Sequence, residues 1–283
     1  MLNKLSNCDV YEKNNERSLR DIKTWQSVLY CVKNILNQHK NYIFKEIEYG
    51  FKKLSPHSIE IPTEKFINKK LSETGWKIYY VDGFISTYKF AELISNKVYP
   101  VNFAIRSSKN IFYSPEPDFV HDILGHVPML FFEPFQRIMV LWAQKTLNNK
   151  PLAIDNLYYN CTLEIIKESK KDEKDQKKIK SLEQELTQII QELHKNPTII
   201  WKLGNFFDWS FEFGIIKDKN HFQIFGGAII TSHNEINSVI QNADKLEKIT
   251  IDVIQQGINY AQSQKKYYYI NNFQDYEKLL NSI

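Results

Sequence analysis

The sequence predicts a mostly α-helical domain with a few short β-strands, an α+β fold dominated by helix. Apolar residues recur at steps of three and four over several long segments, whereas the β-rich runs are short and end at turn signals. No Gly/Ser/Pro-rich linker divides the 283 residues, and glycine and proline occur only nine times each. We therefore predict a single domain at residues 18–283, preceded by a polar tail at 1–17.

The first half of the chain is predicted to alternate helices with short strands. Residues 18–50 form the first predicted helix, because apolar side chains recur there at helical spacing: Leu19, Ile22, Trp25, Leu29, Val32 and Ile35. Turn signals such as Asp82-Gly83 bound the elements that follow. These are helices at 63–74 and 87–96, strands at 76–81 and 98–106, a helix after Pro117 and a helix at 134–147.

The second half contains a charged segment and further helices. Residues 167–180 are almost entirely Lys, Glu and Asp, and a heptad-like apolar seam follows at Ile179, Leu182, Leu186, Ile189 and Leu193. We interpret 165–195 as a charged amphipathic insert. Its helix either packs on its own domain, forms a helical hairpin or makes a dimer contact. The elements predicted next are a helix at 198–216, a strand and turn at 223–232, mostly helix at 235–265, a short strand at 267–272 and a last helix.

Composition excludes several classes of partner. The formal charge is +4 and Lys is interspersed with Asp and Glu, so the chain has no footprint for nucleic acid or for an anionic membrane. No window approaches 18 uncharged apolar residues, and no apolar leader follows Met1. Three widely spaced cysteines, Cys8, Cys31 and Cys161, fit reduced thiols. We therefore predict a cytoplasmic protein.

The run PEPDFVHDILGHVP carries the strongest functional signal. It sets His121 and His126 five residues apart, with carboxylates at Asp118 and Asp122. Neutral imidazoles bind divalent first-row metals, and two of them with one carboxylate form the facial triad of non-haem Fe(II) oxygenases. Residues five apart lie about 140° apart around an ideal helix. We therefore predict that the helix ends near Gly125, so that His126 can turn back toward His121.

A two-histidine iron site also needs a carboxylate ligand. The candidates include Asp118, Asp122, Glu133, Asp208 and Glu212. Glu212 lies in the aromatic run DWSFEFG, where a buried glutamate is costly unless it is paired or bound to a metal. From the residues alone, a metal ligand and a buried salt bridge remain equal alternatives for Glu212.

The histidine motif resembles the iron-binding signature of the pterin-dependent aromatic amino acid hydroxylases, the family of phenylalanine, tyrosine and tryptophan hydroxylases. Further similar segments are DIKTW at 21–25, DGFISTYKF at 82–90, EFG at 212–214 and FGGAIITS at 225–232. The resemblance covers about 18–275 apart from the insert. It indicates a divergent, bacterial-type member reduced to its catalytic domain.

The resemblance implies a fold and an activity. The fold is a single basket-like catalytic domain of the aromatic amino acid hydroxylase type. The activity is a monooxygenase reaction that hydroxylates the ring of phenylalanine, tryptophan or tyrosine with O2, Fe(II) and tetrahydrobiopterin or a related tetrahydropterin. Its partners are small molecules, and we expect a monomer or dimer. The alternative is a non-catalytic paralogue that keeps the iron site for structure and acts as a binding protein.

The resemblance also implies roles for single residues. The metal ligands are His121, His126 and Glu212. The expected catalytic residues are Arg106, which holds the substrate carboxylate, with Asp122 and Asp208. The residues expected to bind the cofactor are Gly83, Phe84, Ser86, Phe90 and Asp122. Thr231 is expected to orient a ligating histidine, and Asp118 to lie beside the ligands.

At four positions this chain departs from the family pattern. Pro100 replaces a histidine near the pterin, and Asp122 replaces a glutamate. Phe207 replaces a tyrosine near the iron, and Asp208 replaces an aromatic wall of the substrate pocket. If Asp208 lines the pocket, the substrate should carry a hydrogen-bond donor; otherwise Trp209 covers the pocket and Asp208 pairs with a lysine or arginine.

Overall fold

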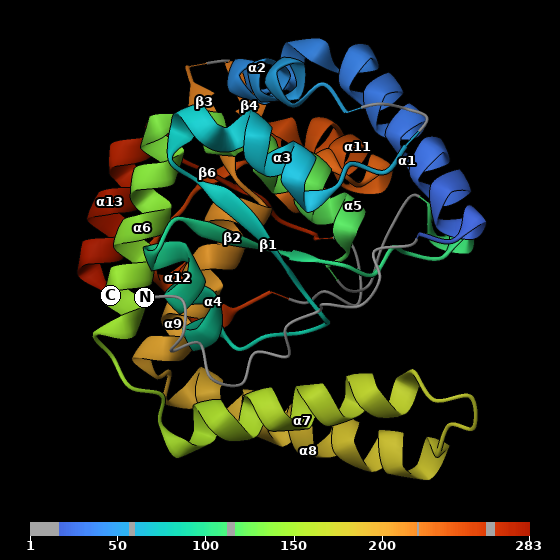
Figure 1. Ribbon diagram of the computed structural model, residues 1–283. Coiled ribbons are helices and arrows are strands. Elements are labelled where there is room, and N and C mark those ends of the chain that lie inside the picture. The colour runs from blue at the N-terminus through green and yellow to red at the C-terminus, as the bar shows by residue number, and fades with distance from the viewer. Residues whose placement is uncertain (1–16, 57–59, 112–116, 220, 259–263) are drawn as a thin grey trace.

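The computed structural model describes residues 17–56, 60–111, 117–219, 221–258 and 264–283. It is mostly helical with three two-stranded sheets, as the sequence predicts (Figure 1). A helical body encloses the core, and one pair of helices projects from it as an arm. Within the described residues, no helix is both long enough and apolar enough to cross a membrane. The predicted tail at 1–17 falls almost wholly outside the described residues, as do residues 113–116 just before the histidine motif.

The predicted helix at 18–50 is wrong in one respect, because two helices occupy this segment. Helix α1 (Leu19–Gln38) begins at a capping box and is followed by α2 (Lys45–Leu54). Between them the chain becomes extended, and the Phe44 backbone N–H donates to the Ile224 carbonyl over 2.9 Å. This pairing with a distant strand lies between the two helices that replace the single predicted helix.

The two strands and the helix predicted at 76–106 form a parallel β-α-β unit. Strand β1 (Lys77–Val81) pairs with β2 (Val98–Asn102), and α4 (Thr87–Ser95) connects them. Helix α3 (Glu64–Leu71) contacts β1. Strand β2 ends at Asn102, four residues before the predicted end. Pro100 is tolerated because every strand of a two-stranded sheet is an edge strand.

Three further helices belong to the body. They are α5 (Phe119–His121), α6 (Glu133–Leu147) and α9 (Ile199–Phe207). Helix α6 contacts α4 on one side and α9 on another, and its Trp142 donates from the indole nitrogen to the Leu203 carbonyl over 2.7 Å. Helix α6 confirms the helix predicted at 134–147. The helix predicted at 198–216 is too long, since a strand begins at Ile215.

The C-terminal third is more broken than its sequence pattern predicts. Strands β3 (Ile215–Asp218) and β4 (His221–Ile224) form a hairpin, and a short helix, α10 (Gly227–Ile230), occupies part of the predicted strand and turn. The helix predicted at 235–265 is divided into α11 (His233–Gln241) and α12 (Ile251–Gln256), and 259–263 lie outside the described residues. The interruption contains β5 (Glu247–Lys248), which pairs with β6 (Tyr268–Tyr269). Helix α13 (Phe273–Ser282) is the predicted last helix.

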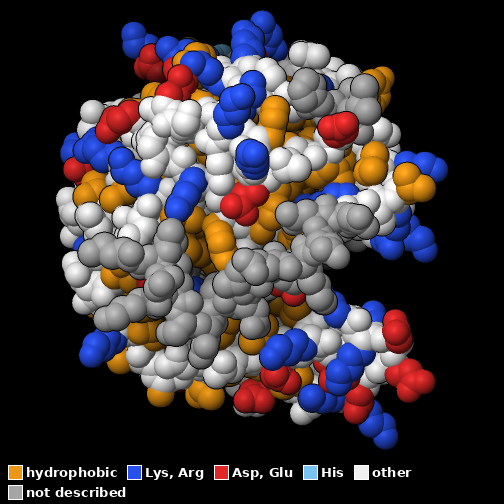
Figure 2. Space-filling view, viewed as in Figure 1, with side chains coloured by type: hydrophobic (Ala, Val, Ile, Leu, Met, Phe, Trp, Pro, Cys, Tyr) orange, Lys and Arg blue, Asp and Glu red, His pale blue; other side chains and the backbone are white. Residues whose placement is uncertain are grey.

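The charged segment forms a helical hairpin, one of the alternatives that the sequence left open. Helix α7 (Ala153–Ser169) packs lengthwise on α8 (Gln176–Lys195), and together they form the arm (Figure 1). The apolar seam of α8 faces α7, where Cys161, Ile189 and Leu193 are buried together. Figure 2 shows Lys, Asp and Glu side chains gathered over the end of the arm.

Candidate metal centre

Asp118 fixes the start of the helix that carries the first histidine. Its carboxylate accepts a hydrogen bond from the His121 backbone N–H over 3.0 Å, as an N-cap does. Helix α5 contains only three residues, and His121 is the last of them. Because Asp118 fixes where this short helix begins, it also fixes where His121 lies in space. Asp118 lies beside the histidine pair, as expected.

The helix does not end near Gly125, so that prediction is wrong. It widens into a π-helical turn at Asp122–His126, and the Val127 backbone N–H donates to the Asp122 carbonyl five residues back. A turn closed by i→i+5 bonds brings residues five apart toward one side, which an α-helix cannot do. The π turn therefore brings the side chains of His121 and His126 together without ending the helix.

Glu212 lies at the end of a second π turn. The residues Asp208–Glu212 continue α9, and the Phe213 backbone N–H donates to the Asp208 carbonyl over 3.0 Å. Single π turns within helices are rare and occur often at functional sites. Here the two turns deliver His126 and Glu212 to the same point from segments far apart in the sequence.

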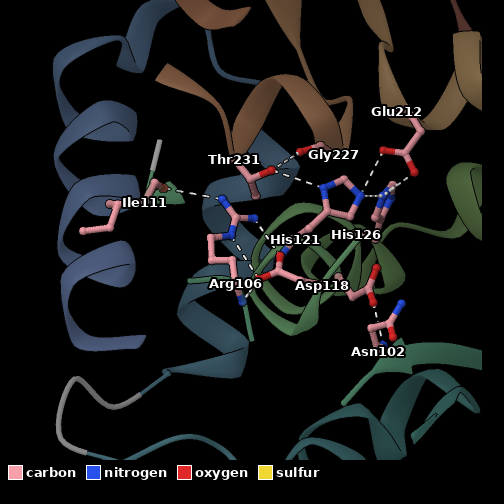
Figure 3. Close-up of polar contacts among 10 residues, drawn as sticks. Asn102, Arg106, Ile111, Asp118, His121, His126, Glu212, Gly227 and Thr231 are labelled. Atoms are coloured by element: carbon pink, nitrogen blue, oxygen red, sulfur yellow. Dashed lines mark hydrogen bonds and ion pairs between the residues drawn. The ribbon is translucent and has the colours of Figure 1, made fainter. Parts of the chain in front are cut away.

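Three side chains converge on one point, as Figure 3 shows: His121, His126 and Glu212. The Nε2 atoms of the two histidines lie 3.0 Å apart, and Glu212 Oε1 lies 3.0 Å from His126 Nε2. Glu212 Oε2 lies 3.1 Å from His121 Nε2. Ligands about 2.1 Å from a metal and at right angles to one another are separated by about 3.0 Å. These distances suit one face of an octahedral metal ion, with the opposite positions open.

Thr231 fixes the orientation and the tautomer of His121. Its hydroxyl donates to the Gly227 carbonyl over 2.8 Å, so its oxygen is left to accept from His121 Nδ1, 3.3 Å away. His121 Nδ1 then carries the proton, and Nε2 presents a lone pair to the point shared with His126 and Glu212. Within the described part of the chain, Glu212 Oε2 is buried and makes no hydrogen bond. A cation would be coordinated by the two Nε2 atoms and the Glu212 carboxylate, and iron suits these ligands.

Electrostatics at this point favour positive charge. Burial alone would raise the pKa of Glu212, but the charges of His126 and His121 outweigh it and hold that pKa well below its ordinary value. Burial would lower the pKa of His121, but Glu212 outweighs it and raises the pKa to about 9. Burial lowers the pKa of His126. The carboxylate of Glu212 therefore makes this point favourable for positive charge.

Two glycines let α10 approach the histidine turn. A Cβ on Gly227 would lie 2.5 Å from His126 Nε2, and a Cβ on Gly125 would lie 2.8 Å from the Gly227 carbonyl oxygen. Real Cβ atoms do not come this close. Gly125 therefore serves the close approach of two backbones and not the end of a helix, and Gly227 leaves room for the ligating ring.

Arg106 is buried beside the metal centre, paired with Asp118 (Figure 3). Its Nε and Nη2 donate to the two Asp118 oxygens over 3.0 and 2.7 Å, and Nη1 donates to the Ile111 carbonyl over 3.4 Å. These bonds use three of the five guanidinium N–H groups and leave one on each terminal nitrogen. Asp118 thus holds both Arg106 and the helix of His121, a connection that sequence reasoning did not reveal.

The loop 82–86 is tied to the metal centre through Asn102, a buried residue that sequence reasoning missed. The Asn102 side chain accepts from the Gly83 backbone N–H over 2.9 Å and donates to the Gly83 carbonyl over 3.3 Å. Its own backbone N–H donates to Asp122 over 2.7 Å. Ser86 caps α4, and Phe84 lies between Gly83 and this cap. Burial raises the pKa of Asp122 to about 7.

Phe90 lies within a cluster of aromatic rings next to the metal ligands. Its ring makes edge-to-face contacts with Tyr99, Trp142 and Phe207, at centroid distances of 5.7, 6.0 and 5.0 Å. Phe207 and Tyr99 in turn lie 6.5 and 5.6 Å from the His126 ring. Phe90 is half-buried within this cluster.

Asp208 lies at the base of the arm. Its charge, together with burial, raises the pKa of the Tyr158 hydroxyl on α7 to about 12, burial being the larger cause. Asp208 is not among the three clustered metal-binding residues of the described chain. The neighbouring Trp209 packs against Phe213 and Tyr268.

Comparisons with known proteins agree with this site. The family model described as "Biopterin-dependent aromatic amino acid hydroxylase" matches residues 13–139 and 176–283. The chain is 24% identical over 271 residues to the chloroplastic phenylalanine 4-monooxygenase of Chlamydomonas reinhardtii, covering 94% of this chain and 61% of that protein. The chain thus spans less than two thirds of this relative.

Solved structures show the same fold. The apo phenylalanine hydroxylase of Colwellia psychrerythraea matches with a TM-score of 0.69 at 22% identity, covering 94% of this chain and 84% of the other. The Chromobacterium violaceum phenylalanine hydroxylase with bound iron(III) and 7,8-dihydrobiopterin matches with a TM-score of 0.68 at 21% identity, covering 95% and 81%. The family model covers well over half of the chain. The chain therefore belongs to the biopterin-dependent aromatic amino acid hydroxylase family.

Proposed function

We propose that this protein is a monooxygenase that hydroxylates the ring of an aromatic amino acid with O2 and a tetrahydropterin. The observation that carries the proposal is the face formed by His121, His126 and Glu212, with three N or O atoms about 3 Å apart. Such a face holds Fe(II) and leaves positions for other ligands. The iron and the reduced pterin supply the activation of O2.

Arg106 is proposed to bind the substrate carboxylate. Its two remaining N–H groups lie on the terminal nitrogens, where they can reach both oxygens of a carboxylate. Asp118 holds the guanidinium on its other edge and prevents it from turning. The amino acid would thus be anchored next to the helix that carries His121, with its side chain directed toward the metal.

The tetrahydropterin is proposed to bind at the loop 82–86 and Phe90. Phe90 is half-buried, and an aromatic ring is a group on which a flat pterin can stack. Gly83, Phe84 and Ser86 form the loop, and Asn102 links Gly83 to Asp122. Asp122 thus lies between the metal ligands and the loop, where its carboxyl group can serve the cofactor.

The substrate class is an aromatic amino acid, and two observations bear on which one. The relatives compared above are phenylalanine hydroxylases. Asp208, however, places a carboxylate where the resemblance implies an aromatic wall. We propose that Asp208 borders the substrate pocket and favours a ring with a hydrogen-bond donor, as in tryptophan or tyrosine.

The test is oxygen uptake by Fe(II)-loaded protein with tetrahydrobiopterin and a panel of phenylalanine, tyrosine and tryptophan. We expect at least one amino acid to stimulate uptake and to gain one oxygen atom, detected by mass spectrometry with labelled O2. The matched control is Arg106→Lys, which keeps the charge but loses the planar fork and should raise the KM of the amino acid. If no amino acid stimulates uptake, the alternative of a non-catalytic binding protein is favoured.

We further propose that the protein acts in the cytoplasm. Cys31 and Cys161 are free thiols in the structure, which suits a reducing compartment. Measurement of the thiol oxidation state in protein isolated without reductant tests this.

A further inference from the structure

The arm contacts the loop 82–86 through an aromatic stack. The Tyr159 ring of α7 stacks on the Phe84 ring, with centroids 5.6 Å apart and planes inclined by 27°. On its other side the loop is held by the Asn102 amide at Gly83. The loop therefore contacts the body at Gly83 and the arm at Phe84.

The base of the arm is fixed to the helix that carries Glu212. Tyr158, adjacent to Tyr159, packs edge-to-face on Trp201 of α9 at 5.3 Å. Thr198, the N-cap of α9, donates to Asp155 of α7 over 2.5 Å. Helix α9 continues into the π turn that carries Glu212. Helix α7 therefore contacts both the loop 82–86 and the helix that leads to a metal ligand.

Helix α7 lies in residues 140–175, which the family model does not match. The contact between Tyr159 and Phe84 therefore involves a residue outside the matched segments.

We propose that Tyr159 is a positioning residue for the cofactor, acting through Phe84 to hold the loop 82–86 in the shape that binds the pterin. This inference rests on the proposed function, since it takes the loop to be a pterin site. Without the stack, the loop must be ordered when the pterin binds, and this ordering weakens binding.

The test is calorimetric titration of the full-length, iron-loaded protein with 7,8-dihydrobiopterin. Tyr159→Ala should weaken binding by about three- to tenfold, the effect of losing one aromatic pair. Tyr159→Phe keeps the ring and should bind like the wild type. The matched control is Leu157→Ala on the same helix, at a side chain that is 52% exposed, and it should also bind like the wild type.

Kinetics separate positioning from general damage. In Tyr159→Ala the KM of the tetrahydropterin should rise by the same factor, while kcat and the KM of the amino acid stay unchanged. The double variant with Phe84→Ala should bind no more weakly than Phe84→Ala alone, because both changes remove one contact. If Tyr159→Ala loses its cooperative thermal transition, Tyr159→Leu replaces it in every measurement.

Unchanged dihydrobiopterin binding in Tyr159→Ala would overturn the inference and leave the proposed function intact. The inference would also be overturned if the losses of affinity from Tyr159→Ala and Phe84→Ala multiplied in the double variant. Binding by Tyr159→Phe as weak as that by Tyr159→Ala would overturn it too. A wild-type protein that binds no dihydrobiopterin would overturn the proposed function, and this inference with it.

Discussion

At the scale of single residues, Thr231 determines which nitrogen of His121 faces the metal, because its hydroxyl is committed to the Gly227 carbonyl. Thr231→Val keeps the shape but removes the acceptor for His121 Nδ1. We expect iron affinity to fall by roughly 10- to 100-fold, the usual cost of losing a group that orients a metal-ligating histidine. Thr231→Ser keeps the hydroxyl and should retain the affinity. Competition with a chelator of known affinity measures both, and equal affinities for the valine and serine variants would refute this role.

Asp208 gives a prediction about specificity. A pocket built around a hydrogen bond rejects analogues that lack the donor by orders of magnitude. We expect the ratio of kcat/KM for tryptophan or tyrosine to that for phenylalanine to exceed one in the wild type and to fall in Asp208→Phe. Steady-state kinetics on the three amino acids supply the ratio. Phenylalanine as the best substrate, with little change in Asp208→Phe, would show that Asp208 faces only the arm and Tyr158.

The site residues differ in how far the sequence could predict them. His121 and His126 were predictable because a metal centre needs particular donors and the motif supplies two histidines, whereas Glu212 was one of several candidate carboxylates until the resemblance assigned it. Asn102 was not predictable, because an asparagine at the end of a strand is equally common without such contacts. Tyr159 was hidden for another reason, since its partner Phe84 lies 75 positions away and no local pattern connects the two.

At the scale of elements, the two π turns explain why the end of the histidine helix was predicted wrongly. The spacing of His121 and His126 excludes a regular α-helix that carries both ligands. One solution is for the helix to end near Gly125. The other is a wider π turn, which leaves no helix end to be capped and keeps the backbone hydrogen-bonded. Propensity does not separate the two, because the π turn is held by the packing of α10 against it.

The packing of α10 gives a prediction at this scale. Gly227→Ala places a methyl group where His126 Nε2 lies, so the ligating ring must move. We expect the variant to lose most of its bound iron while keeping its helical circular dichroism. The matched control is Gly204→Ala in α9, whose Cβ would meet nothing closer than Thr87 Oγ1 at 3.6 Å. That change should retain iron and stabilise the helix by up to about 1 kcal/mol. Full iron content in Gly227→Ala would mean that the turn can relax.

The end of the arm should be sensitive to acid. Hydrogen bonding to Lys171, 2.8 Å away, together with Lys178, lowers the pKa of Glu168 to about 2 from its ordinary 4.5. A depressed folded-state pKa contributes stability above pH 4.5, and this contribution is lost as the pH falls toward 2. The difference in Tm between the wild type and Glu168→Gln should therefore shrink over that range. A difference that does not depend on pH would contradict this assignment.

At the scale of the whole molecule, the sequence predicted most helices and all three parts of the β-α-β unit but not the places where helices break. Between α1 and α2 the chain pairs with β4 at Ile43, and the segment between α11 and α12 pairs with β6. Both breaks come from partners more than a dozen residues away. The local apolar pattern indicates which side of a segment is buried. It does not indicate whether a strand distant in the sequence pairs with that segment.

The tertiary structure also determines which helix packs against the apolar seam of α8. The sequence left open a dimer contact, but Ile189 and Leu193 are buried against α7 of the same chain. The seam is therefore not free to pair with a second copy while the arm is closed.

Iron should stabilise the whole molecule, because its three ligands come from segments that only the folded chain brings together. His121 ends α5, His126 ends the π turn that follows it, and Glu212 ends a second π turn, so the unfolded chain has no equivalent site. Free Fe(II) at about 100 times its Kd adds about 2.7 kcal/mol of stability, which raises the Tm of a chain of this size by roughly 5 °C. Anaerobic thermal unfolding with and without Fe(II) measures the shift. Glu212→Ala should show little of it, and Mg²⁺, which prefers oxygen ligands, should not shift the wild type. An equal shift in Glu212→Ala would mean that the ion which stabilises the fold binds elsewhere, and the carboxylate ligand would then have to be sought at another residue.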